Sequence, residues 1–181
     1  MHRKSFDNMP CPIARSLERV GEWWSMLILR DALHGMTRFD QFQKSLGIAP
    51  NMLARRLNAL VDAGLLSRCR YSEKPPRDEY LLTARGRDFR PVLLALLAWG
   101  NRHFAPEGAS VLLVDAKTGA AVDPILVDPA TGRPIDAPDY ALIAGPAAGE
   151  RTRRRYAARS SSTGEQKPAI GKRGAHARPT T

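Results

Sequence analysis

Two short amphipathic segments joined by a glycine-containing turn constrain the fold of this 181-residue chain more than any other feature. In the first segment, Phe39, Phe42 and Leu46 recur at i, i+3 and i+7, which predicts a short helix from about Phe39 to Ser45. The turn that follows reads GIAP. Its Gly47 supplies the left-handed backbone of a helix end, and its Pro50 fits the start of a new helix.

The second segment, NMLARRLNALVDAGLL, places Leu53, Leu57 and Leu60 on one stripe, and Gly64 ends it. Polar side chains dominate the opposite face. They are Asn51, Arg55, Asn58 and Asp62, with Met52, Ala54 and Arg56 on the flanks. Two short helices joined by such a turn are typical of a helix-turn-helix, whose second helix lies in the major groove of DNA.

The polar face of this second helix is a candidate surface for reading bases. Arginine pairs well with guanine O6 and N7, and asparagine with adenine N6 and N7. Asn51, Arg55 and Asn58 are spaced i, i+4 and i+7, so they are placed to contact consecutive bases, and Met52 and Arg56 complete the set. Arg56 lies nearer the buried side, where a phosphate or an internal acid is an alternative partner. The alternative for the whole face is an ordinary solvated helix surface.

A β-hairpin is expected directly after the helix pair. Leu65 to Ser72 and Glu79 to Leu82 have the pattern of strands, and EKPPRD between them has the pattern of a turn. Lys74 and Arg77 flank the Pro-Pro tip and are candidates for contact with the DNA backbone or minor groove, where cations give sequence-independent affinity. The alternative is a charged surface that protects a strand edge from aggregation.

The first strand of this wing carries two further arginines. Alternation places Arg68 and Arg70 on one face, and Cys69 and Tyr71 on the other. DNA contact and simple edge protection both stay open for the two arginines.

Two helices are expected before the helix pair. Pro12 to Val20 forms the first, with Cys11 as its N-cap, and Trp23 to Leu33 forms the second, which is apolar nearly all round and so is predicted to be buried on most sides. Thr37 is a candidate N-cap of the helix that follows. Together with the first amides of that helix, Thr37 and Arg38 form a candidate phosphate site. The alternative is plain capping beside a solvent-facing charge.

A long helix is predicted from Thr83 to Phe104, with a kink at Pro91 because proline removes one hydrogen bond of the helix. Its apolar stripe is wider than a domain of this size covers easily. We therefore expect part of the stripe to cover a partner.

The charge distribution divides the chain into three segments. Residues 1–105 carry a net charge of +7, residues 106–149 carry −4, and residues 150–181 carry +7. In the middle segment VDAKTGAAVD and VDPATGRPID repeat a D-x-x-T-G turn between β-branched residues, which predicts a small β-hairpin appendage. The last segment is rich in Arg, Lys, Gly, Ser and Pro and is expected to be a disordered basic tail.

Several classes of protein are not supported. The first residues lack an apolar stretch of signal-peptide length, no run approaches the ~18 apolar residues of a membrane span, and two cysteines cannot form a disulfide scaffold, so we expect a cytoplasmic protein. The four histidines lack metal-ligand spacing with either cysteine. Motifs for nucleotide, hydrolase or metalloprotease chemistry are absent from the sequence. We expect no cofactor, no metal and no enzymatic activity.

Five sequence blocks together resemble one family. They are CPI at Cys11, W-x-x-x-I-L-R-D, R-F-x-x-F, L-x-x-R-L-x-x-L-x-x-x-G-L and P-P-R-x-E-Y-x-L-T-x-x-G. The stretch from Cys11 to Gly100 is similar to HxlR-type winged helix-turn-helix transcriptional regulators. The resemblance implies a homodimer, with helical dimer contacts, that binds an operator to repress or activate transcription. The acidic appendage and the basic tail lie outside the shared core.

Cys11 is a candidate redox sensor. A thiolate at a helix N-terminus is stabilised by the helix dipole, and Arg15, one turn further on, adds positive charge. The resemblance adds that some family members sense oxidants or electrophiles through the matching cysteine. The alternative is a small, buried side chain. Cys69, in a strand, is interpreted as packing.

The sequence thus predicts a mainly α winged helix-turn-helix protein with a small β wing, a β appendage and a basic tail. The expected function is a regulator, favoured as a repressor, that binds double-stranded DNA as a homodimer through the helices at Pro12–Val20 and Thr83–Phe104. An oxidant or a small molecule would switch it. Two alternatives remain: a non-specific architectural nucleic-acid binder driven by the tail and wing, and a protein-interaction module on a winged-helix scaffold.

Overall fold

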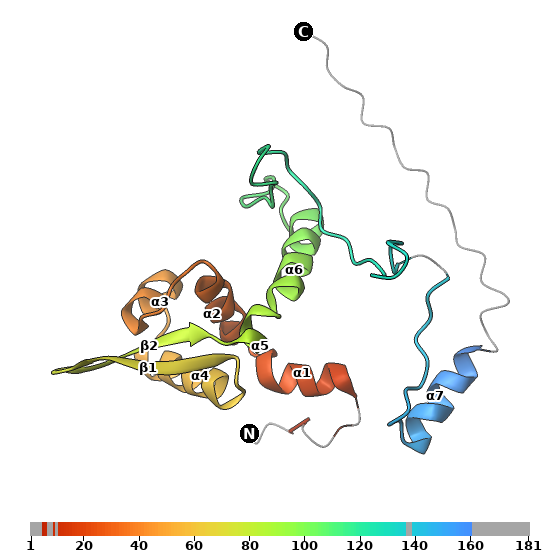
Figure 1. The fold of residues 1–181 in the computed structure, drawn as a ribbon, viewed down its shortest axis with the longest axis horizontal. Helices are drawn as coiled ribbons and strands as arrows, with labels where there is room; N and C mark the ends of the chain where they lie inside the picture. The colour runs from red at the N-terminus through yellow and green to blue at the C-terminus, as the bar shows by residue number, and fades with distance from the viewer. Residues whose placement is uncertain (1–4, 7–8, 10, 137–138, 161–181) are drawn as a thin grey trace, which may run out of the picture. The chain divides into compact units, whose positions relative to one another are not determined.

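The computed structural model describes residues 5–6, 9, 11–136 and 139–160, which divide into two units at Ala137/Pro138. The first unit holds α1 (Pro12–Val20), α2 (Trp23–Leu33), α3 (Phe39–Leu46), α4 (Pro50–Asp62), β1 (Leu66–Glu73), β2 (Pro76–Leu82), α5 (Ala84–Arg87) and α6 (Arg90–His103) (Figure 1). The second holds α7 (Glu150–Ser160). The winged helix-turn-helix architecture is confirmed. None of the described helices is long and apolar enough to span a bilayer.

The core forms where α2, α3 and α4 meet at the base of the hairpin (Figure 1). Phe42 of α3 is fully buried there with Leu53, Leu57 and Leu60, so the predicted leucine stripe of α4 is confirmed as its inner face. The prediction for α2 is partly wrong. Ile28 and Leu29 are fully buried, but the side chain of Trp23 is 74% exposed because no described element covers that side of the first turn.

The turn between α3 and α4 has the predicted geometry. Gly47 follows α3 with φ of +60°, in the left-handed region that favours glycine, and Pro50 begins α4. Ile48 between them is buried in the core. The turn is therefore anchored by packing as well as by backbone geometry.

The hairpin is longer than predicted. β1 and β2 pair antiparallel from Leu66↔Leu82 to Glu73↔Pro76, which leaves only Lys74 and Pro75 at the tip. The predicted start of the second strand, Glu79, is three residues too late. Proline is tolerated at the first residue of a strand, where its missing N–H costs no ladder bond.

The predicted long helix is two helices. Thr83 caps the first of them as expected, since its Oγ1 accepts a hydrogen bond from the Gly86 amide at 3.1 Å. The first helix, α5, ends at Arg87 and the second, α6, begins at Arg90, so Pro91 lies in the first turn of α6. A proline there needs no amide partner, whereas in a continuous helix it would clash with the carbonyl four residues earlier.

The repeated D-x-x-T-G motifs form the predicted turns, but the residues on either side of them do not form the predicted strands. Each is closed by a single isolated bridge, Val114↔Ala121 in the first and Val127↔Pro134 in the second. The Asp115 carboxylate accepts hydrogen bonds from the backbone amides of Thr118 and Lys117. These two bonds stabilise the ionised carboxylate and so lower the pKa of Asp115. Such side-chain bonds to the local backbone compete with strand pairing.

The basic segment after residue 149 begins with a helix. The prediction that residues 150–181 are disordered is wrong for α7. The amide of Arg153 donates to Gly149 O, and Arg154 pairs with Glu150 one turn before it, an arrangement that stabilises a helix. The rest of the predicted tail, residues 161–181, lies outside the described residues.

Gly86→Ala tests the joint between wing and α5. A Cβ at Gly86 would lie 2.1 Å from Leu65 O and 2.9 Å from Leu82 Cδ2, so backbone must move to admit it. We expect the free energy of unfolding to fall by about 1–3 kcal/mol in denaturant titrations. Ala84→Ser, which adds one atom at an exposed position of the same helix, should change it by less than about 0.5 kcal/mol. Equal effects would contradict the close packing.

Candidate nucleic-acid interface

The outer face of α4 is the centre of the candidate interface. Because the leucine stripe is buried, the side chains of Asn51, Arg55 and Asn58 are exposed on the opposite side, as predicted. Met52 is half-buried and packs against the core, which places it at the border of this face. The helix therefore presents its polar face outward on a rigid base.

Arg55 is the positively charged residue at the centre of this face. Within the part of the chain that the structure describes, its guanidinium has no hydrogen-bond or ion-pair partner. Asn51, one turn earlier, accepts a hydrogen bond from the Met52 amide through Oδ1 at 2.7 Å. Arg55 is thus free to donate to a base edge or a phosphate without losing an internal interaction.

Asn58 is tied to the wing. The guanidinium of Arg68 on β1 donates to Asn58 Oδ1, and it also lies over the Tyr80 ring at 5.6 Å. Bidentate readout of adenine needs both the oxygen and the nitrogen of the asparagine side chain. The bond from Arg68 uses one of the two lone pairs of the Asn58 oxygen, and in this conformation it orients α4 relative to β1.

Arg56 faces inward and not toward the outer face. Its guanidinium pairs with Glu22 at 2.9 Å, and the two side chains are only 16% and 31% exposed. Glu22 is the N-cap residue of α2. The internal acid that the sequence left open as an alternative is therefore present, and Arg56 links α4 to α2; a DNA contact by Arg56 stays a prediction that this geometry does not favour.

The start of α3 is already capped. Arg38, and not the predicted Thr37, is the N-cap residue, and Gln41 Oε1 accepts hydrogen bonds from the amides of Thr37 at 3.0 Å and Arg38 at 2.9 Å. These amides are not available to a phosphate while Gln41 holds them. This geometry favours the capping alternative over a phosphate site built from the amides.

The Arg38 side chain remains exposed and lies against the wing. Its guanidinium is 4.8 Å from the ring centroid of Tyr71, a cation–π arrangement. The Thr37 carbonyl also accepts a hydrogen bond from the Tyr80 amide at 2.7 Å. Sequence reasoning placed Tyr71 on a strand face but missed this pairing, because no sequence pattern joins residue 38 to residue 71.

The positively charged side chains of the wing differ in whether they form ion pairs with acidic residues. Arg70 donates to Asp78 at 2.6 Å and lies 3.6 Å from Glu73, and the bond and charge of Asp78 raise the pKa of Arg70. The side chains of Lys74 at the tip and Arg77 at the start of β2 are exposed and, among the described residues, have no hydrogen-bond or ion-pair partner. The charge available to DNA from the wing is therefore concentrated at its tip.

The candidate redox residue lies elsewhere in the first unit. Cys11 precedes α1 as its N-cap, is half-buried and has a free thiol that makes no capping hydrogen bond. Arg15 donates through Nε to Met9 O at 2.8 Å. Cys69 is also a free, half-buried thiol. The described residues contain no group of three or more His, Cys, Asp or Glu side chains that could hold a metal.

The HxlR-like helix-turn-helix family model matches residues 19–108. An HTH-type transcriptional regulator of Mycobacterium tuberculosis H37Rv is 40% identical over 135 residues, which cover 74% of this chain and 85% of that protein. The chain belongs to the HxlR-like helix-turn-helix family. It is thus a DNA-binding transcriptional regulator of the helix-turn-helix type.

Two solved structures resemble this HxlR-like chain beyond the family model. One, a candidate transcription factor from Pseudomonas aeruginosa, is 59% identical, covers 80% of this chain and 99% of its own, and superposes with a TM-score of 0.60. A second candidate transcription factor is 41% identical, with 77% and 98% coverage and a TM-score of 0.68. The similarity therefore includes residues of the appendage that follows α6.

The adjacent arginines of α4 offer a direct test of the site. We expect Arg56→Met and Glu22→Gln each to lower the free energy of unfolding by about 1–2 kcal/mol, because each removes one partner of a half-buried ion pair. The double variant should lose less than the sum. Arg55→Met, at the neighbouring exposed position, should stay within about 0.5 kcal/mol of the unmodified protein. Similar losses for Arg55→Met and Arg56→Met in urea titrations would contradict the assignment.

Proposed function

We propose that this HxlR-like regulator is a repressor that binds a near-palindromic operator as a homodimer. Each protomer places the outer face of α4 in one major groove, and the dimer spaces the two half-sites by about one helical turn, ~34 Å, or a multiple of it. The observation that carries the proposal is Arg55, an exposed cation without an internal partner on a helix whose opposite face is fully buried.

The separation of paired from unpaired cations supports distinct roles. Arg55 reads bases together with Asn51, while Lys74 and Arg77 contact the backbone or minor groove beside the site. Arg38 approaches the phosphate backbone from the start of α3. Arg56 and Arg68 position α4 from within, through Glu22 and Asn58.

Dimerisation is supported by large apolar side chains that the protomer leaves in solvent. α1 exposes Ile13 and Leu17, and α6 exposes Val92, Leu96 and Trp99. Exposed apolar groups gathered on a few elements commonly mark protein interfaces. We infer that these two helices form the dimer contact.

Ile13→Glu and Val92→Glu test this contact. Each places a charge in the proposed interface without touching the core, so the dimer dissociation constant should rise at least about 30-fold, from a cost of roughly 2 kcal/mol. Arg102→Glu, an exposed change on the same α6, should leave it unaltered. Sedimentation equilibrium measures the constant, and a protein that is monomeric before any substitution would exclude the homodimer.

The deciding experiment is a pull-down of genomic DNA from the source organism, followed by sequencing. We expect enrichment of a near-palindromic site. Arg55→Ala should weaken binding to that site by about 10–100-fold, because a bidentate arginine–guanine pair contributes about 1–3 kcal/mol of discrimination. Arg102→Ala is the matched control. Enrichment that survives Arg55→Ala unchanged would move the base-reading role away from α4.

Two further arms of the same pull-down separate the alternatives. Removal of residues 150–181 leaves the first unit intact, so a specific DNA site should still be recovered. Loss of all DNA binding would instead favour the hypothesis of a non-specific architectural binder driven by the basic tail. A mild hydroperoxide should abolish enrichment if oxidation of Cys11 switches the regulator. Cys11→Ser should then be insensitive. Enrichment unaffected by oxidant would direct the search to a small-molecule effector.

A further inference from the structure

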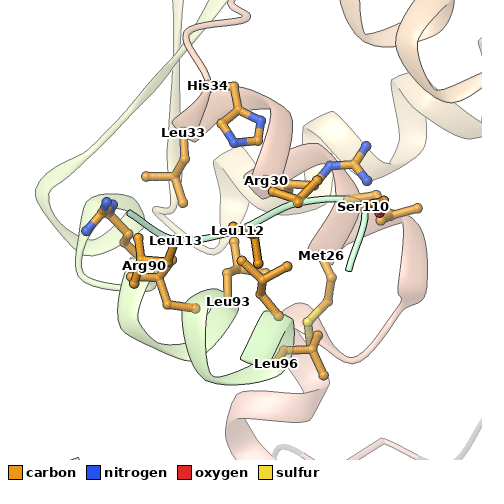
Figure 2. A pocket seen from close by; sticks show the side chains of 14 residues that line it. Met26, Arg30, Leu33, His34, Arg90, Leu93, Leu96, Ser110, Leu112 and Leu113 are labelled. Atoms are coloured by element: carbon orange, nitrogen blue, oxygen red, sulfur yellow. The ribbon is translucent and has the colours of Figure 1, made fainter. Parts of the chain in front are cut away.

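A cavity of about 510 Å³ lies between α2 and α6 (Figure 2). Its walls are mostly apolar, with Met26 and Leu33 from α2 and Leu93 and Leu97 from α6. Volumes of 300–1,000 Å³ with apolar walls and a few polar groups are usual for small-molecule sites. The proposed DNA-binding and redox residues are not part of this cavity.

The segment from Ser110 to Leu113 completes the wall. Figure 2 shows Leu112 beside Leu93 in the middle of the cavity. The segment is held to α6 by a hydrogen bond of 2.9 Å from Asn101 Nδ2 to Val111 O. The start of the appendage thus makes the groove between two helices into a partly closed site.

The ionisable side chains that line this cavity are all of basic residues. Arg30, His34 and Arg90 line it, and none of the described residues that line it is acidic. The charge of Arg30 is balanced by Asp31, 2.8 Å away. Arg90 has no partner in the described part of the chain, so it is an uncompensated cation at the end of an apolar cavity. In Figure 2 it lies beside Leu113, away from Arg30.

We propose that this cavity binds an amphipathic organic anion, with the apolar body against the leucines and the anionic group at Arg90. An unpaired guanidinium next to apolar walls gains a charge-assisted hydrogen bond when a carboxylate arrives. The apolar walls gain by removing the body of the ligand from water. Neither a neutral nor a cationic compound satisfies both parts of the site.

The position of the cavity connects it to DNA binding, and this consequence rests on the proposed function. α2 packs against α4 on one side and faces the cavity on the other, and Glu22 at its start holds Arg56 of α4. α6 is the proposed dimer helix. A ligand between α2 and α6 would alter how the recognition helix is placed relative to the dimer axis.

The test uses the full-length protein and the fluorescent anion 8-anilinonaphthalene-1-sulfonate, titrated to saturation. We expect Arg90→Gln to weaken its binding about tenfold or more, because an ionic hydrogen bond is lost. Arg102→Gln removes a second exposed arginine of α6, outside the cavity, and should have no effect. Octanoate should displace the probe at concentrations at least about tenfold lower than octanol, which has the same apolar body.

A second pair of variants compares a negative charge with a neutral polar group at Leu112, in the cavity wall and outside the core. Leu112 is 57% exposed, so Leu112→Asp and Leu112→Asn should both fold, and only the aspartate should repel octanoate. The proposal is overturned if the probe does not bind, if Arg90→Gln and Arg102→Gln bind alike, or if octanol competes as well as octanoate. These readouts involve no DNA, so failure to find an operator would leave them unaffected, and their failure would leave operator binding intact.

Discussion

The burial of one stripe of leucines on α4 is the constraint on which the rest of the molecule depends. Leu53, Leu57 and Leu60 are fully buried with Phe42 of α3, and truncating such a side chain to alanine typically costs 2–5 kcal/mol. Since the stripe cannot rotate away from the core, the opposite face cannot turn inward. The exposure of Asn51 and Arg55 is therefore a consequence of packing on the far side of the helix.

Two polar links then set the direction of α4 more finely. The ion pair between Arg56 and Glu22 ties it to the start of α2, and the bond from Arg68 to Asn58 ties it to β1. From positive charge alone, both of these arginines would be expected to contact DNA. Because these two arginines are paired inside the protein, a smaller set of exposed cations remains for a polyanionic partner: Arg55 on α4, Lys74 and Arg77 on the wing, and Arg38 at the start of α3.

The helix α2 connects the two surfaces that matter for function. It supports α4 through the core and through Glu22, and it forms one wall of the cavity beside α6. Because protein interiors are close-packed, a shift of α2 at the cavity would be transmitted to α4 without a flexible joint. In this chain, the segment that follows α6 completes the cavity in which we propose that a ligand binds.

The sequence by itself determined the elements whose signal is local. Periodicity gave α3, α4 and the leucine stripe, and glycine and proline marked the turn at Gly47, because these signals depend on residues within one or two turns of each other. It also identified the family.

Only the tertiary structure decided which polar and charged side chains already have partners within the protein. Nothing in the spacing of Arg56, Arg68 or Arg38 shows that they meet Glu22, Asn58 and Tyr71, since those partners arrive from distant segments only when the core closes. The break between α5 and α6 and the cavity that residues 110–113 complete have the same origin: they depend on contacts made across the chain, which local patterns do not encode.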